Sequence, residues 1–466
     1  MPAQQIHGYC ALCISRCGCI ATVEDGVLRK VEADPAHPTG GAFCAKGRAA
    51  PELVNSSERL LYPLRRVEPR AAPTGWERIS WNTALDEIAA RMRQAASAAG
   101  TESVAFSVTT PSGTAISDSF AWIHRLARAF GTPNVVFATE NCNWHKDFSP
   151  QDTFGSGIGM PELAHTGCLL LWGANPSSSW LSLSLEIRKA RQRGMKLVVI
   201  DPRGAGLARG ADLWLQPRPG TDGALALAMA QVMLEQGGED RAFLRRWSNA
   251  PFLVRADNGQ FLRASDLAAG GAPTQYLAWD EARGRAVAPG EAGDCATLAL
   301  SGDYTLLTGA GPVSCRPAFA HYAEACAAMS PERAAEVTGV PAQQIRQAAQ
   351  LMLEAAPSAF FTWTGLCQHG DATQTTRALC LLYALTGQLD APGGNVFFPK
   401  PPINDVSGLN QLPSGMLEKA VGRAQRPLGP GRRGWLSARD LDEELARPEG
   451  KLKGLFAFGG NPLLTK

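Results

Sequence analysis

The chain has 466 residues, a length that predicts about three structural units rather than a single core. Its composition, 45% hydrophobic and 19% charged, is typical of a soluble globular protein, and the formal net charge of +2 argues against nucleic acid as a partner. No apolar run reaches the ~18–20 residues that cross a bilayer. The first residues carry no export signal, so we expect a cytoplasmic protein without a membrane span, unless a partner carries the signal.

Five of the twelve cysteines lie within the first 44 residues. In a reducing compartment, clustered cysteines are better explained by a metal than by disulfides. Cys10, Cys13, Cys17 and Cys44 are spaced C-x2-C-x3-C-x26-C. Three bunched thiolates and one distant thiolate suit a 4Fe–4S cluster, whereas structural zinc, the alternative, usually takes two separated close pairs. Cys19 lies too near Cys17 to be a comfortable fourth ligand, and we expect it to be structural.

Residues 20–34 alternate apolar and polar side chains around Asp25-Gly26, which predicts a hairpin. A small β-rich domain over residues 1–60 would therefore carry the cluster. Lys46, two residues after Cys44, is the cation nearest to the cluster in sequence. Its alternative interpretation is a solvated surface lysine.

Strands and helices alternate after Pro63. Apolar periodicity and capping residues predict a strand or turn at 76–81, a helix from 82 or 83 through 92, a strand at 103–108, a helix at about 118–130 and a strand at 135–138.

The clearest βαβ unit comprises a fully apolar strand at 168–172, a helix at 181–194 and a second apolar strand at 196–200. Such continuous apolar strands with helical crossovers predict a parallel sheet covered on both faces. Ligands of these sheets bind beyond the carboxyl ends of the strands. The residues at these ends are Trp172, Gly173, Asn175, Asp201 and Arg203. Neither turn matches G-x-G-x-x-G, so simple NAD binding is not supported.

Gly220 and Asp222 lie in a P-R-P-G-T-D segment that precedes a strongly helical run at 224–236. A helix N-terminus with a glycine and a carboxylate suits hydrogen bonding to a polar ligand, or it merely caps the helix. Residues 250–300 have weak periodicity and predict an irregular insertion or hairpins.

The remaining chain predicts a helix–turn–helix at 331–352, a strand at 360–363 with a following loop at 365–370, and a helix at 377–387. The apolar run 455–458 is followed by G-G-N-P, which repeats the strand-then-G-x-N-P pattern of 168–176. This modest repeat hints at two related nucleotide-binding halves.

Taken together and in this order, these segments resemble the molybdenum/tungsten–bis(molybdopterin guanine dinucleotide) oxidoreductase family. The motifs that carry the resemblance are C-x2-C-x3-C with G-A-F-C-A-K-G at 10–47, E-R-L-L-Y-P-L-R-R at 58–66, W-E-R-I-S-W-N-T-A-L-D-E-I-A at 76–89, L-L-L-W-G-A-N-P at 169–176, V-V-I-D-P-R at 198–203, P-G-T-D at 219–222, Q-H-G at 368–370 and R-A-L-x-L-L-x-A-L-T-G-Q-L-D-A-P-G-G at 377–394. Each motif alone is modest, but the ordered set is specific.

The resemblance implies a fold and a set of cofactors. The fold is α/β, with the 4Fe–4S domain at 1–60, a discontinuous cofactor-binding domain at 61–140 and 341–466, and an inserted Rossmann-like dinucleotide-binding domain at 141–340, each α/β domain having a mainly parallel sheet. The cofactors are a 4Fe–4S cluster, bis(molybdopterin guanine dinucleotide) and Mo or W.

The resemblance also implies roles for individual residues. Lys46 would lie on the electron path between cluster and pterin, and Gln368 and His369 would contact a pterin face. The other cofactor-binding candidates are Trp172, Gly173, Asn175, Asp201, Arg203, Gly220 and Asp222, of which Asn175, Asp201 and Asp222 would contact a guanine dinucleotide.

In this family one side chain can ligate the metal after the strand that ends near residue 139, and Cys142 is the candidate here. A soft thiolate suits a metal already bound by dithiolenes. His145 and Asp147 would carry protons, or are surface residues of the loop. Formate dehydrogenases of this family have a histidine directly after the ligand, where this chain has Asn143. The loop is closer to a branch resembling acetylene hydratase and phenylacetyl-CoA:acceptor oxidoreductases.

Family members normally run to some 700 residues and end in a β-barrel domain that completes the cofactor site. That domain is absent from this chain, so we expect either a fragment or a separate chain that supplies it. The main hypothesis is a catalytic subunit or fragment that acts on a small-molecule substrate and passes electrons to an external acceptor or an iron–sulfur subunit. The alternatives are a non-redox tungsten hydratase and a truncated, non-catalytic cofactor-binding module.

Overall fold

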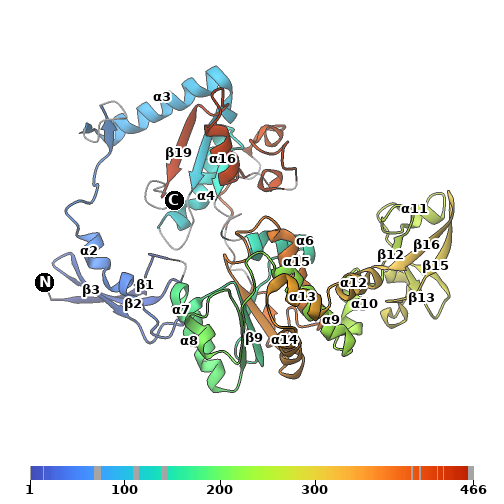
Figure 1. Ribbon diagram of the computed structural model, residues 1–466. Coiled ribbons are helices and arrows are strands. Elements are labelled where there is room, and N and C mark those ends of the chain that lie inside the picture. Colours follow the sequence, from blue (N-terminus) through green and yellow to red (C-terminus); the bar gives the residue numbers. More distant parts are fainter. Residues whose placement is uncertain are drawn as a thin grey trace. The chain divides into compact units, whose positions relative to one another are not determined.

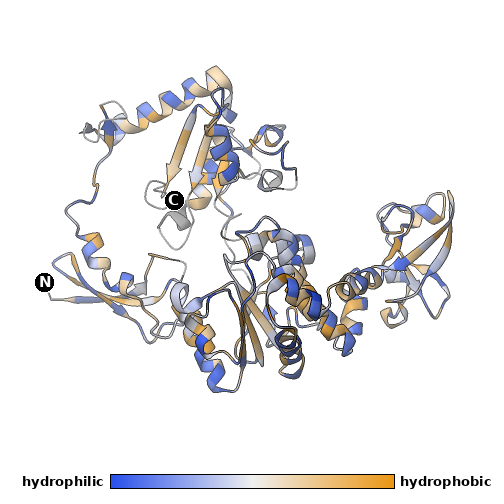
Figure 2. Ribbon diagram, viewed as in Figure 1, coloured by the Kyte–Doolittle hydropathy of each residue, from blue (hydrophilic) through white to orange (hydrophobic). Residues whose placement is uncertain are grey.

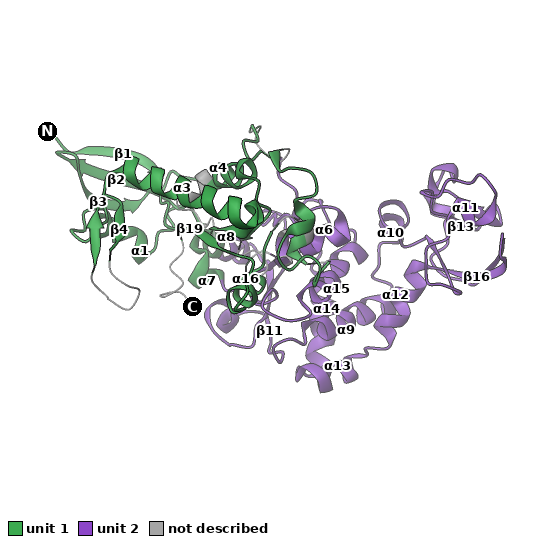
Figure 3. Ribbon diagram, turned by 90° about the horizontal axis from the view of Figure 1, so that it is seen from above, with its two compact units in different colours: residues 1–142, 176–185, 400–466 green, residues 143–175, 186–399 purple. Residues whose placement is uncertain are grey.

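The structure, a computed structural model, describes residues 2–13, 15–67, 75–108, 115–137, 142, 144–399, 402, 404–408, 411–427, 429–433 and 435–459 (Figure 1). The chain forms two compact units (Figure 3). Unit 1 comprises residues 1–142, 176–185 and 400–466, and unit 2 comprises residues 143–175 and 186–399. No helix among the described residues combines the length and the apolar character needed to cross a lipid bilayer.

Unit 1 begins with a three-stranded antiparallel sheet of β1 (Gln4–Tyr9), β2 (Gly18–Glu24) and β3 (Val27–Ala33). The hairpin predicted around Asp25 and Gly26 is confirmed, because Glu24 pairs with Val27 across this two-residue turn. Both turn residues have positive φ, 49° and 77°, as a turn that matches the twist of the flanking strands requires. β1 was not predicted, since its residues are mostly polar and all of them are exposed.

The second sheet of unit 1 is parallel and joins segments that lie far apart in the sequence. Its order is β19 (Gly454–Phe458), β6 (Val104–Val108) and β7 (Val135–Phe137). Phe106 lies fully buried at its centre, with the ring of Phe456 5.7 Å away. The described part of unit 1 also contains the strands β4 (Leu64–Arg66) and β5 (Trp76–Arg78), which pair with each other. Its α-helices include α1 (Ala45–Arg48), α2 (Ala50–Val54), α3 (Trp81–Ala99), α4 (Ala115–Phe130), α7 (Pro176–Ser179) and α16 (Ala438–Leu445).

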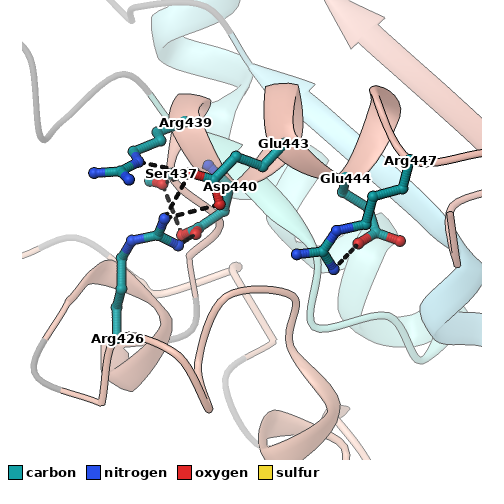
Figure 4. A network of polar contacts seen from close by, with 7 residues as sticks. All are labelled: Arg426, Ser437, Arg439, Asp440, Glu443, Glu444 and Arg447. Carbon is teal, nitrogen blue, oxygen red and sulfur yellow. Dashed lines mark hydrogen bonds and ion pairs between the residues drawn. The ribbon is translucent and has the colours of Figure 1, made fainter.

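A polar network ties helix α16 to the loop that precedes it (Figure 4). The Ser437 hydroxyl accepts a hydrogen bond from the Asp440 amide at 2.9 Å and so caps the helix. Arg426 forms ion pairs with the buried Asp440 and, at 2.8 Å, with Glu443. The arginine therefore bridges two successive turns of α16 and holds the part of the loop around residue 426 against it.

Unit 2 is built on a four-stranded sheet in which every pair of neighbours is parallel, as predicted. The order is β11 (Leu213–Leu215), β10 (Lys196–Ile200), β9 (Cys168–Trp172) and β17 (Ser358–Thr362). All side chains of β9 and β17 are buried, and both strands are among the hydrophobic segments of Figure 2. Helix α8 (Leu181–Gln192) runs between β9 and β10 in sequence, so the expected βαβ unit is present.

Helix α9 (Asp222–Glu235) is the central helix of unit 2. It contacts four other helices, and residues around most of its circumference are buried, which explains why its sequence is apolar on all sides. The four helices are α12 (Ala318–Ala327), α13 (Pro331–Thr338), α14 (Ala342–Glu354) and α15 (Ala372–Leu385). Together with the sheet they enclose the largest hydrophobic core of the chain's described residues.

Residues 253–317 form small antiparallel sheets with cores of their own, which agrees with the hairpins expected at 250–300. The elements are β12 (Leu253–Arg255), α11 (Ala264–Leu267), β13 (Ala278–Asp280), β14 (Arg285–Val287), β15 (Tyr304–Thr308) and β16 (Gly311–Pro317). Unit 2 also contains η2 (Trp144–Phe148), α6 (Ser149–Phe154), β8 (Met160–Pro161), α10 (Arg241–Trp247) and β18 (Asn395–Val396).

The units divide at 142/143, close to the expected 140/141, but the second division lies at 399/400 and not at 340/341. The physical reason is the pairing of β17 with β9, which places residues 358–362 in the same sheet as 168–172. Residues 341–399 therefore belong to unit 2, and only 400–466 return to unit 1. The predicted fold class, α/β with a small β-rich N-terminal domain and mainly parallel sheets, is confirmed.

Candidate cluster and cofactor sites

The four cysteines predicted to bind a cluster line one small cavity in unit 1. Its walls are formed by Cys10, Cys13, Cys17, Cys44, Leu12, Phe43, Lys46 and Gly47. Among the described residues, no three His, Cys, Asp or Glu side chains are placed to hold a single metal ion. The four cysteines line one cavity, which suits a cluster in which each cysteine binds a different iron. Cys19 is buried and does not line this cavity.

Local backbone geometry brings the thiols together. The amide of Cys10 donates to the carbonyl of Cys17 at 2.8 Å, which closes the loop that carries Cys13. Helix α1 then follows Cys44 directly and places Lys46 at the cavity. Gly47 allows the ring of Phe43 to pack on this helix, since a Cβ at that position would lie 2.6 Å from the ring.

The electrostatics of the cavity disfavour four ionised thiols in the absence of a cation. Burial, followed by the neighbouring sulfurs of Cys13 and Cys44, raises the pKa of Cys17 to about 11. Burial also raises the pKa of Cys10, while the charge of Lys46 opposes this increase. Bound iron reverses this preference because a coordinated thiol is held as the thiolate.

A second group of predicted residues meets at the carboxyl edge of the parallel sheet in unit 2. The indole of Trp172, at the end of β9, donates to Asp222 Oδ1 at 2.6 Å. Burial raises the pKa of Asp222, and the Trp172 hydrogen bond and the charge of His369 oppose this increase. Trp172 is fully buried, so it positions Asp222 rather than presenting a surface of its own.

Glycines shape this edge into a close backbone cradle. The amide of Gly365 donates to the carbonyl of Gly173 at 3.1 Å, and a Cβ on Gly365 would lie 2.6 Å from the Cα of Gly173. Gly220 has φ +83°, and a Cβ there would lie 3.6 Å from His369 Nδ1. His369 is itself fixed by a 2.9 Å hydrogen bond to the carbonyl of Gly365. Glycine turns at strand ends in this arrangement allow a ligand's phosphates to approach the backbone.

The other dinucleotide candidates flank the same edge. Asp201 follows β10, and its carboxylate accepts a hydrogen bond from the Arg203 amide at 2.8 Å. Part of the hydrogen-bonding capacity of this carboxylate is therefore used within the turn. The Arg203 side chain is exposed. Asn175 lies two residues after Gly173, and Gln368 directly precedes His369, both on loops that leave the carboxyl ends of β9 and β17.

The segment after Cys142 is anchored within unit 2 by contacts that the sequence did not predict. The Trp144 indole donates to Thr373 Oγ1 at 2.8 Å, and the Ser149 hydroxyl donates to the Thr373 carbonyl at 2.9 Å. Trp144 is buried against Cys367. The one feature of the sequence that could have indicated this anchoring is Trp144, a tryptophan in a mostly polar loop.

The loop after Cys142 is therefore held against the start of α15, next to the loop that carries Gln368 and His369. Cys142 is half-buried, and the side chains of His145 and Asp147 lie outside the described residues. The second G-x-N-P motif, at 459–462, lies mostly outside them as well.

The geometry of these sites fits the cofactors that the motifs imply. One cavity offers four thiols, and one sheet edge offers glycine turns, a helix N-terminus with Asp222, and polar side chains from four loops.

Comparison with known proteins supports this interpretation. Residues 3–56 match the model of the molybdopterin oxidoreductase Fe4S4 domain, and residues 59–466 match that of the molybdopterin oxidoreductases. The chain is 30% identical over 390 residues to the perchlorate reductase subunit alpha of Dechloromonas aromatica, covering 76% of this chain and 41% of that protein. It is 33% identical over 249 residues to the acetylene hydratase of Syntrophotalea acetylenica, covering 53% of this chain and 34% of that protein.

The fold is also similar to the solved structure of acetylene hydratase from Pelobacter acetylenicus, with a TM-score of 0.68 and 24% sequence identity, over 90% of this chain and 49% of that one. The chain thus spans less than half the length of these relatives. The matches assign it a 4Fe–4S cluster and a molybdopterin guanine dinucleotide cofactor with Mo or W. The chain therefore belongs to the molybdopterin oxidoreductase family.

Proposed function

We propose that this chain is the cluster- and dinucleotide-binding part of an enzyme that transforms a small-molecule substrate by two-electron chemistry at Mo or W. The observation that carries the proposal is the cavity on which Cys10, Cys13, Cys17 and Cys44 converge. A 4Fe–4S cluster bound there transfers single electrons, which suits exchange with an external acceptor or an iron–sulfur subunit. Lys46, on the wall of this cavity, is assigned to the electron route.

We assign the carboxyl edge of the unit 2 sheet to the guanine dinucleotide and the pterin. The Trp172 indole occupies Oδ1 of Asp222 and fixes the orientation of the carboxylate. The other carboxylate oxygen of Asp222 accepts a hydrogen bond from the ligand. Gly173 and Gly220 keep the edge open to phosphates, while Asn175, Asp201 and Arg203 line it from the neighbouring loops. The loop with Gln368 and His369 contacts a pterin face.

Cys142 is proposed as the protein ligand of the metal, and His145 and Asp147 as groups that hold and move protons near the substrate. The support is local: Trp144 and Ser149 fix the segment that follows Cys142. Such anchoring keeps a ligand loop in place, which a reactive metal site requires.

Metal content after anaerobic purification tests the assignment of the cluster ligands. We expect about four irons per chain, which Cys17→Ser lowers and Cys19→Ser leaves unchanged. The second variant is a matched control, because Cys19 is equally buried but does not line the cavity. Equal iron content in the two variants would contradict the assignment.

The metal ligand is tested by the X-ray absorption spectrum of Mo or W in the loaded protein. Cys142→Ser replaces sulfur by oxygen and should shift the absorption edge and the fitted coordination shell, whereas Cys295→Ser, a partly buried cysteine in another segment, should not. An unchanged spectrum in the Cys142→Ser variant would remove this residue from the metal site.

A second candidate function is non-redox hydration of a triple bond at tungsten, and the sequence similarity to acetylene hydratase favours it. Turnover of acetylene without any electron acceptor would support hydration, whereas strict dependence on an acceptor would support the oxidoreductase. The matches cover less than half of the relatives, so the activity of a complete enzyme is part of either proposal.

A further inference from the structure

Unit 2 contains a cavity of about 730 Å³ that none of the assignments above uses. It lies between α6, α10, α12 and the second half of α15. Its α15 residues, from Arg377 to Leu385, follow the helix start at Ala372 by 5–13 residues. At 1.5 Å per residue, they lie about 8–20 Å along the helix from the cofactor edge. The cavity is therefore separate from that edge, and its volume is within the range of small-molecule sites.

Two residues of the lining, Thr153 and Tyr322, carry hydroxyl groups that do not open into the cavity. Thr153 Oγ1 and Tyr322 Oη are both inaccessible to solvent. The Tyr322 hydroxyl interacts instead with the thiol of Cys326. A ligand of the cavity would therefore contact the other walls.

The remaining walls indicate what kind of molecule fits. Most of the lining is apolar, including the rings of Phe252 and Phe319, and Trp247 is 69% exposed. Arg246, whose guanidinium lies 5.3 Å from the centre of the Trp247 ring, and Arg377 are the cations of the lining, against one carboxylate, Asp152. Aromatic walls with a net positive charge favour an apolar body that carries an anionic group.

We propose that this cavity binds an organic anion with an aromatic or aliphatic body. The body lies against the phenylalanine rings, and the anionic group is held by Arg246 and Arg377. The site is distinct from the cluster cavity and from the dinucleotide edge, and it does not depend on the proposed reaction.

A matched pair of probes tests the proposal on the full chain. 8-Anilinonaphthalene-1-sulfonate and N-phenyl-1-naphthylamine share the same body, a naphthalene joined to a phenyl ring through an amine. Only the first carries a sulfonate, and the second is uncharged. We expect the anion to bind at one site, seen as energy transfer from tryptophan, and the neutral probe to bind at least ~10-fold more weakly, because a charge-assisted hydrogen bond is missing. Guanosine diphosphate should not displace the anion.

Variants then place the probe in the cavity. Arg377→Gln should weaken binding of the anion about tenfold and leave the neutral probe unaffected. Arg285→Gln, which removes an exposed arginine on β14, is the control and should change neither affinity. Equal affinities for the two probes, displacement by guanosine diphosphate, or an Arg377→Gln variant with unchanged binding would each overturn the proposal.

Discussion

The stability of unit 1 should depend on one buried histidine as the pH falls. His124 lies on α4 and is 6% exposed, with the ring of Phe120 4.2 Å away between centroids. Its Nε2 atom is buried and has no hydrogen-bond partner among the described residues. Burial, followed by the charge of Arg128, lowers the pKa of His124 from 6.5 to about 4.

The size of this effect follows from the difference between the two pKa values. Because the folded pKa is the lower one, the unfolded chain takes up a proton first, and stability present above pH 6.5 is lost as the pH falls toward 4. At about 1.4 kcal/mol per pH unit, the full loss is about 3 kcal/mol. At pH 4.5 it is about 2.5 kcal/mol, which corresponds to a roughly 80-fold larger equilibrium constant for opening.

Hydrogen exchange measured by mass spectrometry on peptides from β6 and the second half of α4 reads this opening directly. After correction for the intrinsic effect of pH on exchange, the wild type should lose about 80-fold in protection between pH 7.5 and 4.5. His124→Leu should lose much less, because it has no group to protonate. His321→Leu, at an exposed position on α12, is the control and should behave as the wild type. If the His124→Leu variant loses as much protection as the wild type, the argument from burial is wrong.

Three further predictions concern other parts of the chain. Thr373→Val removes the acceptor of the Trp144 indole and should destabilise the segment after Cys142 by about 1 kcal/mol. The effect should appear as faster hydrogen exchange of the amides of residues 144–154. Unchanged hydrogen exchange would mean that this hydrogen bond is not needed there. Gly365→Ala places a methyl group against the backbone of Gly173 and should reduce retention of the guanine dinucleotide on gel filtration, whereas Gly370→Ala, which meets no atom within 4 Å, should not. Two arginines lower the pKa of Glu443 to about 2, so the contribution of this carboxylate to stability is complete above pH 4.5 and is lost between pH 4.5 and 2. If the stability of Glu443→Gln fell as steeply as that of the wild type in this pH window, Glu443 would not be the group responsible.

Local patterns in the sequence predicted much of the fold. The cysteine spacing, the hairpin at Asp25-Gly26, and most helices and strands depend on neighbours within a few residues, and the structure agrees with them. The five residues of β9 are apolar without interruption, which predicted a strand buried on both faces.

Contacts between distant segments could not be predicted in the same way. Nothing in the residues of β17 indicates that they pair with β9, and this pairing is why the expected boundary at 340/341 differs from the observed one. The anchoring of Trp144 by Thr373 joins residues 229 positions apart, and the second partner is an ordinary threonine. The roles of Cys142, His145 and Asp147 stay predictions that come from the family resemblance.

The pairing of β17 with β9 also has a consequence for how the protein is made. While the ribosome synthesises the residues between 172 and 358, one edge of β9 has no neighbouring strand. At roughly 5–20 residues per second, this interval lasts on the order of 10–40 s. A fully apolar strand with an unpaired edge is prone to aggregation during such a delay, so we expect chaperones to bind the nascent chain.

The same delay governs when the edge next to β9 and β17 is completed. Gly365, which closes the cradle against Gly173, follows β17 in the chain. The contact between Gly365 and Gly173 therefore does not exist until the ribosome has synthesised the residues through 365, and a ligand of this edge can bind in its cradle only after that point.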